Sequence, residues 1–295
     1  MMRFYFLLLL LAAGMAGPAT YAQQYNTRGI LCGDDRVLIL EYNPYTYRAD
    51  TTWSWHAAET KGLPSDYLRR LRTMDEVKPS STGDSLLLTS SSGAVLLLDR
   101  HTKEALFYAA CPNAHSAEFL PNNRIAVANS VAEGGNSLEI YDLSMPEKVL
   151  FKDTLHSGHG VVWIESRQQL FALGYQELKV YSLSDWDSNQ PKLSLDAVHT
   201  IPDRSGHDLS WVNDNKLLLT THHSVFEFDI DAGSFAEYTP LKGVEHVKSV
   251  NYDERTGQLL YTKGETSWWT HNVYHLNPDV TIHVPGVRIY KARFF

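Results

Sequence analysis

Four histidines recur at matching places in the sequence, and together they could do chemistry. His115, His159, His207 and His246 each stand at the start of a short apolar segment. Imidazole binds borderline metal ions and carries protons near neutral pH. If the fold brings the four together, they form a candidate catalytic centre or a site for a divalent metal ion. The alternative is a structural role, in which each histidine hydrogen-bonds the neighbouring repeat.

Lysines and carboxylates accompany these histidines. Alternate side chains of a strand share one face, so we expect Lys78, Lys248 and Lys291 one step deeper than the histidines. Such a cationic arc suits a carboxylate or sulfate on a ligand. Alternatively, internal ion pairs with neighbouring acids, including Glu245, neutralise the lysines. The candidate substrate-binding residues are Lys78, Lys248, Lys291, Glu76, Glu118 and Asp208.

Other catalytic signatures are absent from the sequence. Two of the three carboxylates could flank a glycosidic bond, and their separation would decide the mechanism. There is no Gly-x-Ser-x-Gly nucleophile motif, no phosphate loop and no dinucleotide fingerprint. The net charge of −8 argues against a nucleic-acid partner, which would need a basic face. With 43% hydrophobic residues, the composition is that of a folded protein.

The elements that must position these residues are short strands in repeated units. One unit runs through segments 158–163, 169–174, 177–182 and 192–195, with turn residues between them. The equivalent first positions Glu76, His115, His159, His207 and His246 are separated by 39, 44, 48 and 39 residues. A period of about forty residues with four strands is typical of a β-propeller blade. The only clear candidate helix is Ser65 to Arg72.

The two ends of the repeat region complement each other. Segments 30–33, 37–42 and 52–55 supply three strands, and Arg288 to Phe295 supplies one more in phase with the repeats. We therefore expect an all-β, six-bladed propeller in which the last strand is the innermost strand of the first blade. Such closure pairs edges that would otherwise promote aggregation. The alternatives are five blades with an open end, or seven blades with a degenerate one at 61–73.

The N-terminal 22 residues have the pattern of a signal peptide. A short basic start precedes the apolar run from Phe4 to Gly17, and Ala22 provides a small residue for cleavage. We therefore expect residues 1–22 to be removed, residues 23–295 to form one propeller domain, and the protein to be periplasmic or extracellular. We also expect a monomer, no transmembrane segment, and free thiols at Cys32 and Cys111.

Several motifs carry a family resemblance. Asp75-Glu-Val-Lys, Asn113-Ala-His-Ser-Ala-Glu, His159-Gly-Val-Val-Trp, His246-Val-Lys-Ser and Tyr290-Lys-Ala-Arg resemble an uncharacterised family of secreted bacterial β-propeller proteins. The resemblance covers nearly the whole chain after the signal sequence and implies no particular reaction. The axial histidines are also similar to those of oligogalacturonate lyases, which are larger, seven-bladed propellers with a divalent metal at the axis. That second resemblance implies a saccharide substrate.

These observations predict a propeller that engages an acidic saccharide at the mouth of its channel. As an enzyme it would be a lyase, in which a histidine or lysine removes the proton next to a uronate carboxylate. Lysines or a metal ion would then stabilise the negative charge. A glycoside hydrolase is a less favoured possibility. The alternative is a non-catalytic propeller that binds a glycan or a protein, because the fold supports both roles.

Overall fold

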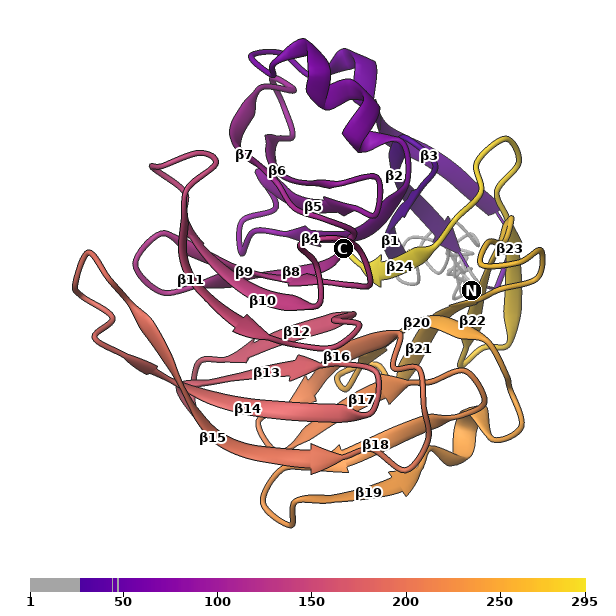
Figure 1. Cartoon of the computed structure of the whole chain (residues 1–295). Coiled ribbons are helices and arrows are strands. Elements are labelled where there is room, and N and C mark those ends of the chain that lie inside the picture. Colours follow the sequence, from indigo (N-terminus) through magenta and orange to yellow (C-terminus); the bar gives the residue numbers. More distant parts are fainter. Residues whose placement is uncertain (1–26, 44, 47) are drawn as a thin grey trace, which may run out of the picture.

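The protein is a ring of six antiparallel sheets, each of four strands, around a central axis (Figure 1), and we call the region along this axis the channel. This computed structural model describes residues 27–295 except 44 and 47. The ring confirms the six-bladed propeller expected from the repeat period, and the five-bladed and seven-bladed alternatives are wrong. The predicted signal peptide, residues 1–22, lies outside the described residues.

The first blade joins the two ends of the described chain. Its innermost strand β24 (Lys291–Phe294) pairs with β1 (Thr27–Gly33), and the sheet continues outward through β2 (Arg36–Asn43) and β3 (Arg48–His56). In Figure 1 the yellow C-terminal strand therefore lies beside the indigo strands of the N-terminal part. The predicted closure is confirmed, and Cys32 of β1 pairs with Lys291 of β24.

The other five blades each use four consecutive strands, numbered outward from the channel. The second blade consists of β4 (Met74–Pro79), β5 (Ser85–Ser90), β6 (Ala94–Asp99) and β7 (Ala105–Ala110). The third consists of β8 (Ala114–Leu120), β9 (Arg124–Asn129), β10 (Ser137–Asp142) and β11 (Val149–Thr154). The fourth is β12 (Gly160–Ile164), β13 (Gln169–Leu173), β14 (Glu177–Ser184) and β15 (Lys192–Thr200). The fifth consists of β16 (Asp208–Asn213), β17 (Lys216–Thr220), β18 (Val225–Asp229) and β19 (Ser234–Glu237). The sixth consists of β20 (Val247–Asp253), β21 (Gln258–Lys263), β22 (Asn272–Leu276) and β23 (Val280–His283).

Helical structure in the described chain is limited to short 3-10 segments. The candidate helix at Ser65 to Arg72 forms the 3-10 helix η3 (Ser65–Leu71) between the first two blades. It packs through the buried Tyr67 and Leu71. The others are η2 (Ala57–Glu59) and η4 (Thr239–Leu241). No helix among the described residues is both long and apolar enough to span a membrane.

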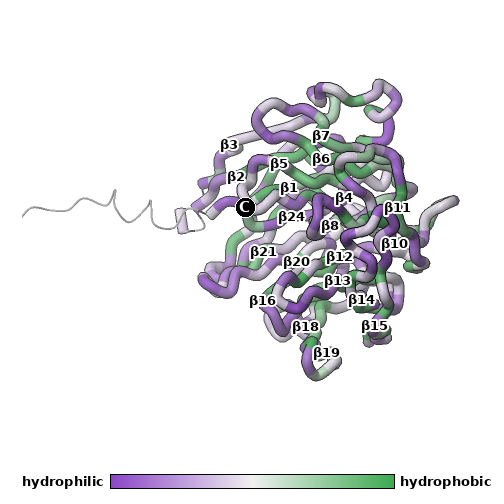
Figure 2. Tube along the Cα trace, turned by 90° about the vertical axis from the view of Figure 1, so that its left-hand side faces the viewer, coloured by the Kyte–Doolittle hydropathy of each residue, from purple (hydrophilic) through white to green (hydrophobic). Residues whose placement is uncertain are grey.

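The core lies between neighbouring blades. Apolar side chains of adjacent sheets pack together in a series of clusters around the ring, such as the one that joins Val127 of β9 to Leu87 of β5. Hydrophobic stretches accordingly follow the strands, and hydrophilic residues gather at the turns (Figure 2). Cys32 and Cys111 are both buried and free, as expected from the sequence. This packing leaves only the innermost strands to face the channel.

Candidate functional site

Six side chains, one from each blade, surround one end of the channel, and we call them the mouth ring. In each blade, the innermost strand has a first residue from which its pairing with the neighbouring strand is regular. The member of the mouth ring is the residue directly before it. The first regular pairs are Glu76↔Thr89, Ser116↔Ala128, Gly160↔Leu173, Asp208↔Thr220, Ser249↔Thr262 and Lys291↔Cys32. The mouth ring therefore consists of Asp75, His115, His159, His207, Lys248 and Tyr290.

Three members of the mouth ring occupy irregularities in strand pairing. The register shifts between Met74 and Glu76, between Ala114 and Ser116, and between Val247 and Ser249. The extra residues at these bulges are Asp75, His115 and Lys248. A bulge redirects a side chain that regular alternation would send to the opposite face. Strand irregularity thus places these three groups beside the histidines of the fourth and fifth blades.

The bulges also correct two sequence-based assignments. The sequence alignment placed Glu76 and His246 at the same phase as the other histidines, whereas Asp75 and Lys248 occupy that phase. His246 instead has a left-handed backbone with φ 60° and packs its ring against His222 at a centroid distance of 4.4 Å. Its side chain is 43% exposed, so His246 lies beside the site and outside the mouth ring.

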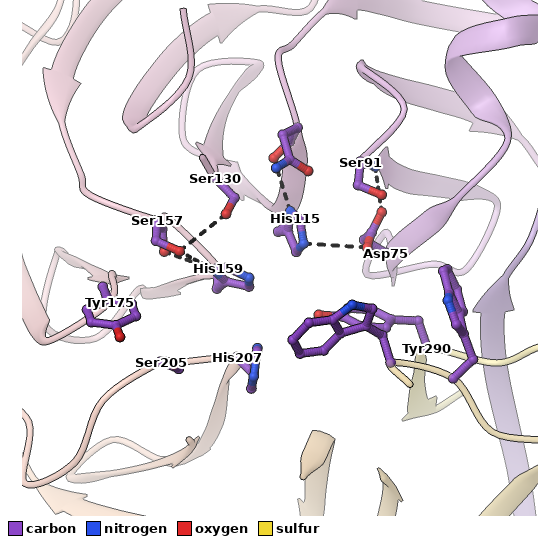
Figure 3. Close-up of a pocket in the computed structure, with 14 residues that line it drawn as sticks. Asp75, Ser91, His115, Ser130, Ser157, His159, Tyr175, Ser205, His207 and Tyr290 are labelled. Carbon is purple, nitrogen blue, oxygen red and sulfur yellow. Dashed lines mark hydrogen bonds and ion pairs between the residues drawn. The ribbon is translucent and has the colours of Figure 1, made fainter. Parts of the chain in front are cut away.

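Five members of the mouth ring line a cavity of about 380 Å³, and the sixth, Lys248, is buried behind His207. Figure 3 shows His115, His159, His207 and Tyr290 around the same space. The rest of the lining is polar and aromatic: Asp75, Ser91, Asn113, Ser130, Ser157, Tyr175, Ser205, Gly206, Trp268 and Trp269. The indole of Trp268 is 49% exposed. The cavity therefore offers hydroxyl groups and imidazoles together with an aromatic surface.

Backbone carbonyls fix the tautomers of two histidines. Nδ1 of His115 donates to the carbonyl oxygen of Asn113 at 3.0 Å, and Nδ1 of His159 donates to that of Ser157 at 2.8 Å. Burial lowers the pKa of both imidazoles, and that of His159 lies well below 6.5. Both are therefore neutral at pH 7, and their Nε2 atoms are left as hydrogen-bond acceptors.

His207 differs because it faces a lysine. Nζ of Lys248 lies 3.0 Å from Nε2 of His207, and 4.5 Å from the centroid of the Trp268 ring. Nδ1 of His207 is buried without a hydrogen-bond partner. Burial, followed by the charge of Lys248, lowers the pKa of His207 well below 6.5. Burial likewise lowers the pKa of Lys248 to about 7, so this ammonium can lose its proton near neutral pH.

Asp75 is the carboxylate that enters the cavity, and the sequence alignment did not select it. Its Oδ1 lies 3.7 Å from Nε2 of His115, and its Oδ2 accepts a hydrogen bond from the backbone N–H of Ser91. Burial raises the pKa of Asp75, and His115 would oppose this rise only in its protonated form. The opposing aromatic wall includes Tyr290, whose ring centroid is 6.1 Å from that of His115.

The predicted carboxylates Glu76 and Asp208 lie deeper, in a four-residue ionic cluster that we call the waist. Lys291 Nζ lies 3.2 Å from Glu76 Oε2 and 3.1 Å from Asp208 Oδ1. Arg293 donates to Asp208 through both terminal nitrogens and to Glu76 through one, at 2.5–3.0 Å. Although burial alone raises carboxyl pKa values, these cations hold the pKa of both acids below its usual range. Glu76 and Asp208 therefore do not line the mouth cavity, and their role as substrate-binding residues stays a prediction.

Lys78 and Glu118 lie at the opposite end of the channel. Lys78 Nζ contacts Glu118 Oε2 at 2.8 Å and the carbonyl oxygen of Val161 at 2.6 Å. Both residues line a second cavity of about 340 Å³, together with Trp163 and Trp211. The three predicted lysines therefore do not form one cationic arc. Lys78 and Lys291 are paired internally, and Lys248 alone of the three reaches the mouth ring.

The four-histidine metal site stays a prediction without geometric support. Among residues 27–295, apart from positions 44 and 47, no group of three or more His, Cys, Asp or Glu side chains is arranged to hold a metal ion. His115, His159 and His207 do come together, whereas His246 contacts His222 instead. The histidine arrangement is therefore best described as three neutral rings beside a lysine.

Comparisons with known proteins identify a family and a fold. Residues 30–295 match a family model described as "Family of unknown function (DUF6528)". No curated protein matches the sequence. A chain from a structure described as a nidogen/laminin complex aligns over 91% of this chain and 98% of its own length, with a TM-score of 0.63 and 14% identity. At this identity the likeness concerns the propeller fold alone, and the similarity to oligogalacturonate lyases stays a sequence-based resemblance.

Proposed function

The chain belongs to DUF6528, a family of unknown function. From the lining of its mouth cavity, we propose that the protein binds the end of an acidic saccharide. The observation that carries this proposal is the combination of the half-exposed Trp268 with a polar cavity of about 380 Å³. A sugar ring has apolar faces and a rim of hydroxyl groups. An indole packs against such a face, as aromatic side chains commonly do in ligand sites.

The hydrogen-bonding character of the cavity supports a ligand rich in hydroxyl groups. The fixed tautomers of His115 and His159 direct Nδ1–H to the backbone and leave Nε2 as an acceptor. Four serines add hydroxyl groups, which both donate and accept. Lys248 has no carboxylate within ion-pair distance among the described residues, so an acidic group on the ligand would be its first counter-ion.

Binding can be tested with uronate disaccharides and their neutral counterparts. We expect galacturonate or glucuronate disaccharides to change the tryptophan fluorescence and to release measurable heat on binding. Trp268→Ala should weaken binding about fivefold, since an aromatic contact contributes on the order of 1 kcal/mol. Trp211→Ala is the matched control, because Trp211 is also 49% exposed but lies at the opposite mouth.

The outcomes of this experiment separate the possible roles. Equal losses in Trp268→Ala and Trp211→Ala would show that the mouth cavity is not the binding site. Lack of binding to every saccharide would contradict the proposal and favour a protein-binding propeller. Because the comparison uses two residues of the same type and exposure, a general loss of stability would affect both variants.

A lyase is the second candidate, and the tautomer of His159 favours it. The neutral His159 presents an unprotonated Nε2, which is the form that a general base requires. In β-elimination the base takes the proton next to the uronate carboxylate, the C–H electron pair forms a double bond, and the glycosidic oxygen leaves with a proton from water. Absorbance of the unsaturated product would test this reaction. Binding without such absorbance would leave a non-catalytic binding protein.

A further inference from the structure

Lys248 and His207 form a buried pair in which the lysine ammonium has no negatively charged partner among the residues that the structure describes. Lys248 is 1% exposed and its Nζ contacts Nε2 of His207, while Nδ1 of His207 has no partner. The other buried lysines differ: Lys291 meets two carboxylates, and Lys179 meets Glu177 and a backbone carbonyl. A buried cation without a counter-ion is costly, and an unpaired buried N–H adds to that cost.

The side chains around this pair do not supply a negative charge for Lys248. Along the mouth ring, the neutral His159 packs against His207 at a centroid distance of 5.3 Å. The turn after β17 adds His222, whose ring lies 6.0 Å from that of His207, and His246 packs behind His222. His115 and the cationic Lys291 also act on His207 electrostatically. All these groups are neutral or cationic. The acids on this side, Glu245 at 4.0 Å from Nε2 of His246 and Asp203 near His222, face the outer histidines, and neither forms an ion pair with Lys248.

We propose that the His207–Lys248 pair is the carboxylate subsite of the mouth cavity, and that it takes up one proton when an acidic ligand binds. This inference rests on the proposed saccharide function and specifies where the acidic group sits. The ligand carboxylate accepts a hydrogen bond from Nδ1–H of His207. Nε2 of the same ring accepts one from the Lys248 ammonium, whose charge faces the Trp268 ring.

The proton balance gives the pH dependence of binding. Without ligand, Lys248 has a pKa lowered to about 7, so at pH 8 it is mostly a neutral amine. A bound carboxylate favours the ammonium form and raises this pKa, so binding at pH 8 draws a proton from the solvent. At pH 5.5 the lysine is already protonated in the free protein, and binding there draws none.

Calorimetry of the full chain in two buffers with different ionisation enthalpies measures this proton directly. With a galacturonate disaccharide, we expect uptake to rise from near zero at pH 5.5 to about one proton at pH 8. The neutral galactose disaccharide should show no uptake at either pH. Tight uronate binding at pH 8 without proton uptake would overturn the subsite while leaving the saccharide function intact. Absence of binding by either sugar would overturn both.

Two variants of Lys248 test whether this residue carries the proton. Lys248→Arg keeps a permanent charge, so it should retain uronate binding within a few-fold but show no uptake at pH 8. Lys248→Met removes the charge, so its affinity for the uronate should fall at least tenfold while its affinity for the neutral disaccharide is unchanged. Undiminished uptake in either variant would overturn the assignment. Lys263→Met is the control, because Lys263 also lies over an aromatic ring, that of Tyr274, but does not line the mouth cavity.

Discussion

The waist and the mouth ring are neighbouring layers around the same channel, but charged groups are paired in the waist and left incompletely paired in the mouth ring. In the waist, two acids meet two bases, with contacts between both signs at 2.5–3.2 Å. In the mouth ring, Lys248 has a histidine instead of a carboxylate, and Asp75 lies 3.7 Å from an imidazole. Three waist residues, Glu76, Asp208 and Lys291, each directly follow a member of the mouth ring in the sequence.

This difference separates a structural cluster from a candidate site. A buried ion pair with both partners present is tolerated, whereas a buried charge without a partner is retained at a cost in stability. Functional sites are where such costs are commonly found. The ion pairs of the waist thus hold β24 against the neighbouring blades. The mouth ring contains Lys248, a buried cation for which an acidic ligand would be the counter-ion.

The largest expected effect comes from removing part of the waist together with its strand. Deleting residues 291–295 removes β24, Lys291 and Arg293, and leaves Glu76 and Asp208 buried without their cations. It also exposes the edge of β1. We expect loss of the cooperative melting transition, or aggregation. An unchanged transition measured by circular dichroism would contradict the role of β24 in closure.

Lys291→Met tests the waist without removing the strand. Arg293 alone then faces two buried carboxylates, and breaking a buried ion pair in this way costs about 3–5 kcal/mol. We expect a correspondingly lower free energy of unfolding in a urea titration at pH 7. A smaller loss in the double variant Lys291→Met/Asp208→Asn would show that the uncompensated carboxylate causes the effect, since the second change removes a negative charge.

The same substitution in the mouth ring should have the opposite sign. Lys248→Met replaces a buried, unpaired ammonium by an apolar group, which we expect to stabilise the protein by about 2 kcal/mol at pH 6. The folded pKa is about 7 against 10.5 for an ordinary lysine, so the cost is fully present below pH 7 and disappears as the pH rises to about 10.5. Urea titrations at pH 6 and pH 10 measure this difference. Destabilisation at pH 6 would mean that Lys248 is a structural residue.

The sequence predicted the architecture well because the repeat period and the phase of the last strand are properties of the whole chain. It predicted His115, His159 and His207 correctly as neighbours, since one residue type marks the same position in three consecutive blades. It failed at Asp75 and Lys248, where the residue type changes and a bulge shifts the register. A bulge has no sequence signature of its own here, so Glu76 and His246 were assigned in their place.

Pairing of the lysines was also beyond the sequence. Lys78 and Glu118 belong to adjacent blades, and Lys291 meets Asp208 across the channel. These distances depend on how the blades are arranged around the axis, which no local pattern encodes. The suggestion that internal ion pairs neutralise the lysines applies to Lys78 and Lys291, whereas Lys248 is the exception that directs attention to the mouth ring.

The smallest expected effect concerns the acid sensitivity of the mouth ring. Burial lowers the folded-state pKa of His115, His159 and His207 below 6.5. As the pH falls below about 6.5, the unfolded chain takes up protons first. The free energy of unfolding therefore decreases from there down through the folded pKa values, and above pH 6.5 it is unaffected by these groups. Each histidine adds at most about 1.4 kcal/mol per pH unit to this slope.

His159→Asn isolates one of these contributions. The asparagine amide can still donate to the carbonyl of Ser157, which Nδ1 of His159 contacts at 2.8 Å, but it does not titrate. We expect a change below about 1 kcal/mol at pH 7.5 and a shallower fall in stability between pH 6.5 and 5, measured by urea titration. His101→Asn, at an exposed turn outside the channel, serves as the comparison. If His159→Asn keeps the wild-type slope, as His101→Asn should, the fall in stability between pH 6.5 and 5 does not arise from His159. The waist carboxylates do not account for that fall either, because their folded pKa values are lowered and they lose stability only at a more acidic pH.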